Sequence, residues 1–439
     1  MSEQSRTHDQ PLVIDQPRIS LDVVALVLIF VASVLVHLTR LGDMAMHHDE
    51  SIHAWVSWRF FTGSGDFTCA NGRTATTYCY DPVYHGPSLY IFTVISFFLF
   101  GDGEWQARLP QALAGIGLTL SMLWLRPFLG RNGSLIAAAA VTLSPVALYF
   151  TRFARHDGLM ILWEALIVIG FFRYLESRER RWLWLLGAGI GLATTTHELY
   201  YIIGFLFVWF VGLRAASENV AQRIVNLAML ALIGIALFVE VLILSGTWSG
   251  NVTASLNAGG MAVAIFFVAG ISLAILQIWD NQPIITPLIR HLWQDARAEL
   301  YTALTIAVSI FVIFYGNFFT DPRGILDGMY QGLAYWLGSQ QTFARGDQPW
   351  YYYLMVMGLN EPLALFGSIS ISIAAVVHAV KRFQAARSGK PIEASVPFFT
   401  TFLVYWFVGT LVFFSWAGEK MPWLAIHITV PALLLVISG

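Results

Sequence analysis

The sequence predicts an all-α polytopic membrane protein, and three observations support this. Of the 439 residues, 57% are hydrophobic and only 12% are charged, whereas soluble domains are about 25% charged. The apolar residues form continuous runs of spanning length, and do not alternate as in a β-barrel. Aromatic residues make up 15% of the chain, as is common where rings line membrane interfaces. Together with a net charge of -2, these features exclude a soluble enzyme and a nucleic-acid-binding protein.

Twelve apolar runs are predicted to span the bilayer. No small-residue cleavage site follows the first run, so we expect a retained helix and not a signal peptide. A further run, 88–101, has about 14 residues, which fits an interfacial or re-entrant helix better than a span. Two runs, 182–196 and 200–213, are short, and we expect their ends to extend. The predicted spans lie at about 21–38, 110–128, 134–151, 158–175, 182–196, 200–213, 225–245, 258–279, 300–318, 361–380, 396–416 and 422–438.

The basic residues predict the orientation, because Lys and Arg favour the cytoplasmic side. If 88–101 does not cross, 16 of the 25 basic residues lie inside, and both ends of the chain are inside. We therefore expect a single transmembrane domain, residues 1–439, in the inner (plasma) membrane. Its first external loop is long, 39–109, and carries short interfacial helices, and a second long external loop covers 319–360. Loops of this length in a compact protein are usually functional.

The first candidate site follows the first span directly, in His47-His48-Asp49-Glu50 with His53 nearby. Adjacent carboxylates beside imidazoles suit acid–base chemistry or metal binding. A solvated loop would also tolerate such a cluster. In the same external loop, Cys69 and Cys79 are expected to form a disulfide if that side is oxidising, and two free thiols are the alternative.

The second candidate site has Arg152, Arg155 and Asp157 at a helix junction on the same side. Guanidinium groups suit phosphate oxygens. The alternative is that these arginines anchor helix ends by snorkelling, which the predicted orientation disfavours.

Further candidates occupy other external positions. His197 and Glu198 would be costly at membrane depth unless paired, and a structural hydrogen bond explains either one equally well. His85 lies in a turn, where a satisfied histidine is the simpler interpretation. Lys420 could hold a lipid phosphate or pair with Glu419.

The order of these features resembles the GT-C superfamily of membrane glycosyltransferases. Asp49-Glu50 matches the acidic pair after the first span, and His85-Gly86-Pro87 is similar to the family's His-Pro-Pro. Arg108-Leu109-Pro110 and Ser144-Pro145 with 152–157 match later elements. More narrowly, His-His-Asp-Glu, Tyr84–Pro87, Thr-His-Glu and Gly-Glu-Lys-Met-Pro-Trp resemble a branch of the protein O-mannosyltransferase-like proteins (glycosyltransferase family 39-like). That branch is associated with archaeal lipid-linked-glycan flipping.

The resemblance implies inverting transfer of a sugar from a polyprenyl-phosphate donor to a hydroxyl of a protein, glycan or lipid acceptor, on the outer face. Asp49 would be the catalytic base and Glu50 a supporting acid, while Arg152, Arg155 and Lys420 would contact the donor phosphate. The other cavity candidates are His48, His53, His85, Asp157, His197, Glu198 and Glu419.

Two questions stay open on the sequence. Within the superfamily, the oligosaccharyltransferase branch uses a divalent metal ion and the protein mannosyltransferases do not. Here such an ion could be held by His47, His48, Asp157 and Glu198. The competing functions are a non-enzymatic transporter or flippase-associated component, and a structural subunit of a larger complex.

Overall fold

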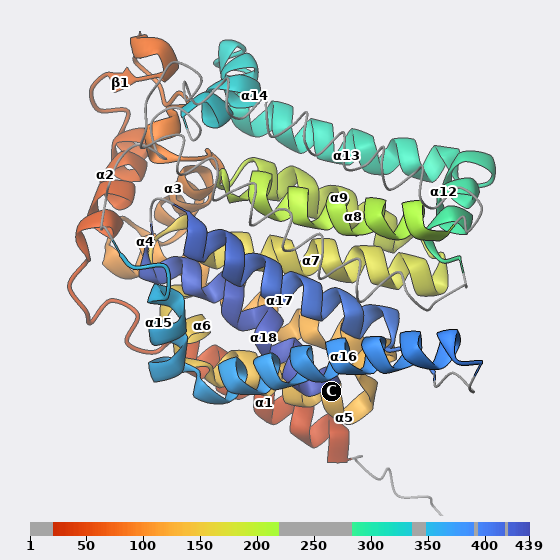
Figure 1. Cartoon of the computed structure of the whole chain (residues 1–439). Coiled ribbons are helices and arrows are strands. Elements are labelled where there is room, and N and C mark those ends of the chain that lie inside the picture. Colours follow the sequence, from red (N-terminus) through yellow and green to blue (C-terminus); the bar gives the residue numbers. More distant parts are fainter. Residues whose placement is uncertain (1–20, 219–282, 336–347, 390–393, 418–419) are drawn as a thin grey trace, which may run out of the picture.

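The computed structural model describes residues 21–218, 283–335, 348–389, 394–417 and 420–439, and it is a bundle of helices (Figure 1). Seven described helices are long and apolar enough to cross a membrane, with Glu104–Leu143 counted as one. The chain is therefore a multi-pass membrane protein, as predicted. The predicted spans 225–245 and 258–279 lie outside the described residues.

The helices that form the body of the bundle are α1 (Leu21–Leu38), α4 (Glu104–Ser121), α5 (Arg126–Leu143), α7 (His156–Ser177), α8 (Arg180–Thr194), α9 (Leu199–Glu218), α13 (Arg297–Tyr315), α16 (Pro362–Arg387), α17 (Phe398–Trp416) and the shorter α18 (Ile426–Ser438). Gly130, with φ of 72°, separates two helical stretches and agrees with the predicted boundary between 110–128 and 134–151. Of the two short predicted spans, α9 is extended to 20 residues, whereas α8 keeps 15.

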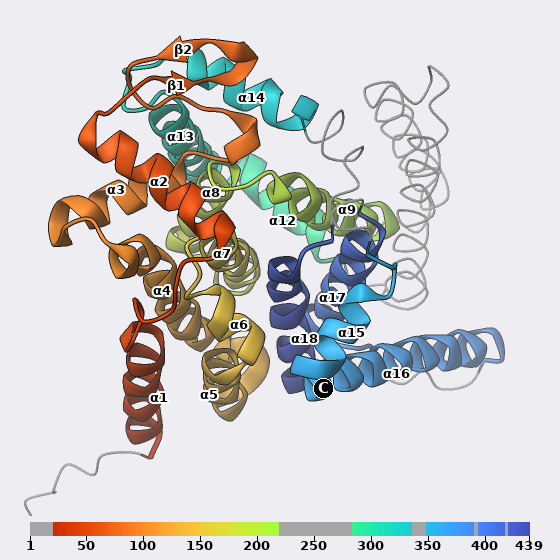
Figure 2. The same cartoon turned by 90° about the vertical axis from the view of Figure 1, so that its left-hand side faces the viewer.

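The shorter elements gather at one end of the bundle, which we call the loop end (Figure 2). They are α2 (His48–Thr62), β1 (Phe67–Thr68), β2 (Thr74–Ala75), α3 (Ser88–Phe100), α6 (Pro145–Phe150), α14 (Arg323–Tyr335) and α15 (Tyr352–Asn360), whereas the short α12 (Ile285–Gln294) lies elsewhere. The run 88–101 forms α3, whose 13 residues extend about 20 Å. It is too short to cross the roughly 30 Å hydrocarbon core, and its interfacial or re-entrant position stays a prediction.

The first long loop, residues 39–109, is folded and is held in place by a disulfide and by ion pairs. The strands β1 and β2 form an antiparallel ribbon, a feature that the sequence did not predict. Cys69 and Cys79 beside it form a disulfide. Arg73 then reaches α14 and the turn before it, with ion pairs of 2.9 Å to Asp321 and 3.5 Å to Asp327. The two long loops are thereby joined at the loop end.

The predicted continuous span 134–151 is wrong in one respect, because the helix breaks at Ser144. Pro145 has no N–H to continue the α5 hydrogen bonds, so it begins a new helix, α6, at its first turn. The Ser144 hydroxyl accepts a bond from the Ala147 amide. Glu361, buried at the start of α16, accepts bonds from the Ser144 hydroxyl and, at 3.1 Å, from the Val146 amide.

Close helix packing builds the rest of the bundle. Gly187 of α8 lies against Ala303 of α13, where an added Cβ would be 2.3 Å from the Ala303 carbonyl oxygen. Small residues allow such approach between membrane helices. Apolar side chains of α4, α7, α17 and α18 fill the interior, while α1 is mostly exposed, as suits a helix that faces lipid. This frame fixes the ends of α4, α7 and α18, which carry the polar residues below.

Candidate active site at the loop end

Two polar clusters lie next to each other at the loop end. The acid–arginine cluster comprises Asp49, Glu50, Arg108, Arg155 and Asp157. The imidazole cluster comprises His53, His85, His156 and His197, together with Glu198. Their residues come from α2, the turn before α3, α4, the start of α7 with the residue before it, and the α8–α9 connection. Most of the predicted site residues are therefore gathered in one region of the fold.

Glu50 is the anchor of the acid–arginine cluster. Its side chain is 3% exposed and accepts two 2.8 Å bonds from Arg108 and one each from the Ala154 and His47 amides. Burial raises the pKa of the Glu50 carboxyl, but the bonds from Arg108 and the two amides outweigh it and hold the pKa below its usual value. The His47 bond belongs to a capping box that begins α2. Because both carboxylate oxygens are engaged, Glu50 is suited to fix geometry.

Asp49, its neighbour, is placed differently. Its side chain is 23% exposed, and Oδ2 accepts one bond of 2.9 Å from Arg155 Nη1. Arg155 also lies 3.3 Å, through Nε, from Oδ2 of the buried Asp157, and its guanidinium lies 3.8 Å from the ring centre of Trp423. Arg155 is thus held from three sides. Asp49 can still reach a molecule outside the protein.

The cluster continues into the bundle through residues that the sequence analysis missed. His427 of α18 lies between two acids of α7: Nε2 is 3.5 Å from Asp157 Oδ1, and Nδ1 is 2.7 Å from Glu164 Oε1. All three side chains are at most 1% exposed. Neither Glu164 nor His427 is among the residues predicted for the site, although an ionisable residue within an apolar span is itself a signal of function.

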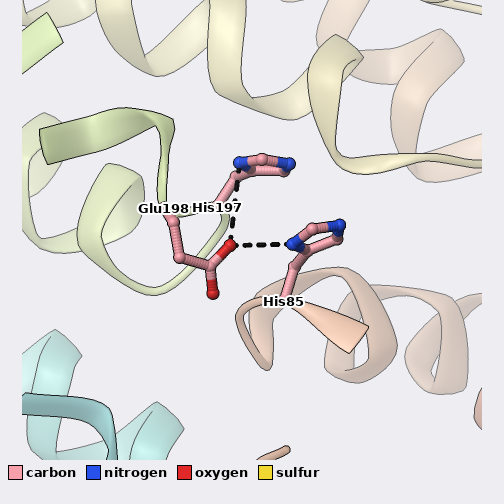
Figure 3. A group of neighbouring side chains, drawn as sticks. All are labelled: His85, His197 and Glu198. Carbon is pink, nitrogen blue, oxygen red and sulfur yellow. Dashed lines mark hydrogen bonds and ion pairs between the residues drawn. The ribbon is translucent and has the colours of Figure 1, made fainter. Parts of the chain in front are cut away.

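The imidazole cluster brings four rings together. His85 stacks on His197 with ring centres 4.1 Å apart, and His156 lies 4.9 Å from His53 and 5.2 Å from His85. Glu198 accepts a 2.8 Å bond from His85 Nδ1, as Figure 3 shows, and a 3.3 Å bond from the Tyr80 hydroxyl. His85 therefore does more than complete a turn. His156 was absent from the predicted site, although its neighbours Arg155 and Asp157 were in it.

Burial affects the pKa of two histidines of this cluster. Burial, with Arg155 and His85 nearby, lowers the pKa of His53 well below its usual value, and burial followed by the same two neighbours does so for His197. The His53 Nδ1 lies 2.8 Å from the Tyr90 hydroxyl. A neutral imidazole keeps one nitrogen with a lone pair, which can bind a metal ion.

A cavity of about 480 Å³ lies beside Glu50. Its basic lining consists of Arg40, His47, Arg108 and Arg152. Arg152 donates a 2.8 Å bond to the Thr39 carbonyl, and burial lowers its pKa. The predicted phosphate contacts are thus divided: Arg152 lines this cavity, whereas Arg155 contacts Asp49.

The remaining predicted residues have various positions. Lys420 donates a bond to the Ala417 carbonyl, and His48 is exposed on α2. Glu419 lies outside the described residues. The predicted metal set is not gathered: among the described residues, the group of three potential ligands within 4.8 Å is His85, His197 and Glu198, and His47 Nδ1 instead accepts the Asp49 amide.

Part of the chain is similar in sequence to known mannosyltransferase-like proteins. Residues 84–244 match the family model of dolichyl-phosphate-mannose-protein mannosyltransferases. YkcB of Bacillus subtilis (strain 168), described as a candidate mannosyltransferase, is 31% identical over 147 residues, 32% of this chain and 20% of YkcB. YycA of the same organism, described likewise, is 31% identical over 106 residues, 24% of this chain and 15% of YycA. The chain thus spans about a fifth or less of these relatives.

The structural comparison covers nearly the whole chain. ArnT from Cupriavidus metallidurans, in a crystal structure with bound undecaprenyl phosphate, matches with a TM-score of 0.54 and 18% identity. The match covers 94% of this chain and 59% of ArnT. The chain therefore has the GT-C-type fold predicted from its sequence, with a segment that is similar to the protein mannosyltransferases.

Proposed function

We propose that this protein transfers a sugar from a polyprenyl-phosphate donor to the hydroxyl of a protein, glycan or lipid acceptor, at the outer face of the plasma membrane. The observation that carries the proposal is the partly exposed Asp49 carboxylate, held by Arg155 at the loop end of a GT-C-type fold. The mannosyltransferase-like segment and the lipid phosphate bound to ArnT support the donor class.

In the proposed reaction, Asp49 takes the proton of the acceptor hydroxyl while the oxygen attacks the anomeric carbon. The bond between that carbon and the phosphate oxygen breaks from the opposite face, so the configuration inverts and polyprenyl phosphate leaves. Arg155 lies next to Asp49 and can stabilise the charge that develops on the leaving phosphate. Glu50, whose oxygens are engaged by Arg108 and two amides, holds α2 and thereby positions Asp49.

The division of the arginines suggests two binding regions. The cavity with Arg40, Arg108 and Arg152 has room and basic lining for an anionic group. Arg155 and Lys420 complete the predicted phosphate contacts nearer to Asp49 and the start of α18. We assign the reacting phosphate to Arg155, because this guanidinium alone among the predicted contacts touches Asp49 in the described residues.

The test uses the purified full chain with labelled undecaprenyl-phosphate sugars, including the mannose form. We expect the wild type to move label from the lipid to an acceptor, and Asp49→Asn to lower the rate by about 100-fold or more. Asp66→Asn, an exposed acid of the same loop, is the control and should keep the wild-type rate. Thermal unfolding verifies that both variants are folded.

Full transfer by Asp49→Asn would overturn the role of Asp49. Translocation of the lipid in reconstituted vesicles, without sugar transfer from any donor tested, would instead support the transporter hypothesis.

A further inference from the structure

We propose that His85, His197 and Glu198 bind a divalent transition-metal ion of the zinc class, with His156 as the fourth ligand. This inference goes beyond the proposed transferase function, and its residues share only Glu198 with the metal set predicted from the sequence.

The three side chains already converge. One potential ligand atom from each lies within 4.8 Å of the other two, and each residue is 4–7% exposed. Glu198 Oε2 is 2.8 Å from His85 Nδ1 and 3.8 Å from His197 Nδ1 (Figure 3). Ligand atoms around a tetrahedral zinc ion, with bonds of about 2.0–2.2 Å, are roughly 3.3 Å apart. The observed separations bracket this value, so small side-chain rotations would admit the ion.

The donor set selects the class of metal. Two imidazole nitrogens and one carboxylate oxygen suit zinc and its transition-metal neighbours. Calcium and magnesium prefer shells made of oxygen. Histidine must supply a lone pair to bind a metal. His197 Nδ1 uses its lone pair to accept a 3.0 Å bond from the Leu199 amide, and metal binding at this nitrogen would replace that bond.

The backbone around the site is organised in advance. The Gly86 amide donates to the Thr196 carbonyl at 3.1 Å, and the Ser88 amide donates to the Thr195 carbonyl at 3.0 Å. A Cβ on Gly86 would lie 2.3 Å from the Thr195 oxygen, so glycine is required for this approach. His85 itself has φ of 67°, an uncommon value for a non-glycine residue that is typical of functional sites. The Tyr80 hydroxyl, bonded to Glu198 Oε1, orients the carboxylate from outside.

His156 is suited to complete the site. It is fully buried, and its ring centre is 5.2 Å from that of His85 and 5.8 Å from that of His197. Its Nε2 lies 3.3 Å from the Gly86 carbonyl, and in the described part of the chain its Nδ1 has no hydrogen-bond partner. If Nε2 donates to that carbonyl, Nδ1 keeps a lone pair for the metal. Four protein ligands make a closed, structural type of site.

The experiment measures metal content and needs no sugar donor. The purified full chain is stripped with EDTA, dialysed against micromolar zinc with a weak competing chelator, and analysed by mass spectrometry for metal. We expect about one zinc per wild-type chain. His197→Gln, Glu198→Gln and His156→Gln should each retain at least tenfold less zinc under the same conditions. His291→Gln is the matched control, because His291 also faces a carboxylate, Asp295 at 3.1 Å, but on the exposed α12.

Measurements on the wild type keep the test valid if a variant misfolds. Zinc should raise the thermal unfolding temperature of the stripped protein, and X-ray absorption at the zinc edge should show nitrogen and oxygen ligands at about 2.0–2.1 Å. Zinc content no higher than in a His197→Gln, Glu198→Gln double variant would overturn the site, and so would the absence of a zinc-dependent shift. Unchanged zinc in His156→Gln would overturn the fourth ligand. None of these results bears on the transferase proposal.

Discussion

The acid–arginine cluster and the imidazole cluster are neighbours, but different interactions hold them in place. In the first, opposite charges compensate each other: Glu50 pairs with Arg108, and Arg155 lies between Asp49 and Asp157. In the second, imidazole rings stack, and backbone bonds between Gly86 and Thr196 and between Ser88 and Thr195 set their distance. A frame of paired charges can leave one acid, Asp49, accessible. A frame of stacked rings brings several imidazole nitrogens close together.

The largest expected effect tests the charged frame. Glu50→Gln would leave Arg108 buried without a compensating charge, and breaking a buried pair costs about 3–5 kcal/mol. The free energy of unfolding in detergent should fall by this amount. Asp43→Asn is the control, because Asp43 pairs with Arg40 at the surface, and it should leave stability unchanged. Equal stability of the two variants would show that the ion pair does not hold α2.

The same pair predicts a pH dependence. The pKa of Glu50 is lower in the folded protein than its usual value of 4.5. The stabilisation is therefore complete above about pH 4.5 and is lost as the pH falls through the lower, folded-state pKa. We expect the stability difference between wild type and Glu50→Gln to be constant near neutral pH and to shrink below about pH 4.5. A difference that grows in acid would contradict this assignment.

The next effect separates the two arginines of the predicted phosphate site. Arg155→Met removes the charge beside Asp49 and should slow sugar transfer by about 100-fold. Arg152→Met removes a half-exposed group that bonds a single carbonyl, and should slow transfer by less than about fivefold. Rates with a labelled donor at saturation decide between them. The reverse order would place the reacting phosphate in the cavity that Arg152 lines.

The smallest expected effect tests the backbone support of the imidazole cluster. Gly86→Ala forces a methyl group against the Thr195 carbonyl and should cost about 1–3 kcal/mol of stability. It should also weaken zinc retention, since it displaces His85 from His197 and Glu198. Gly204→Ala has nothing within 4 Å of the added carbon and should be neutral or slightly stabilising. Wild-type zinc content in Gly86→Ala would show that the backbone pairing does not set the cluster.

The sequence predicted the fold where a local signal exists. Hydropathy located the spans, since burial in lipid demands long apolar runs, and the shortness of 88–101 identified α3. The break at Ser144 was missed, because apolar residues continue on both sides of Pro145 and the compensating Glu361 is distant in the sequence. The ribbon of β1 and β2 was missed because it involves only two residue pairs.

The candidate site shows the same division. Asp49 and Glu50 are adjacent in the sequence, and so are His197 and Glu198. This adjacency allowed them to be predicted as site residues. Arg108 donates hydrogen bonds to both carboxylate oxygens of Glu50, whereas Asp49 stays partly exposed. The sequence could not show this difference, because it depends on contacts between α2 and α4. His427 is an isolated polar residue in an apolar helix, and its role becomes apparent only from its ion pairs with Asp157 and Glu164. The orientation of the bundle and the roles of the site residues stay predictions.

The contact between Glu361 and the broken helix has a consequence for biosynthesis. The Val146 amide donates to Glu361, which is made 215 residues later. At about 5–20 residues per second, translation of that interval takes roughly 10 to 40 s. During this time the Val146 amide lacks this acceptor, and an unsatisfied amide is costly wherever water is excluded. A nascent chain ending before residue 361 should therefore be an early target for membrane quality control.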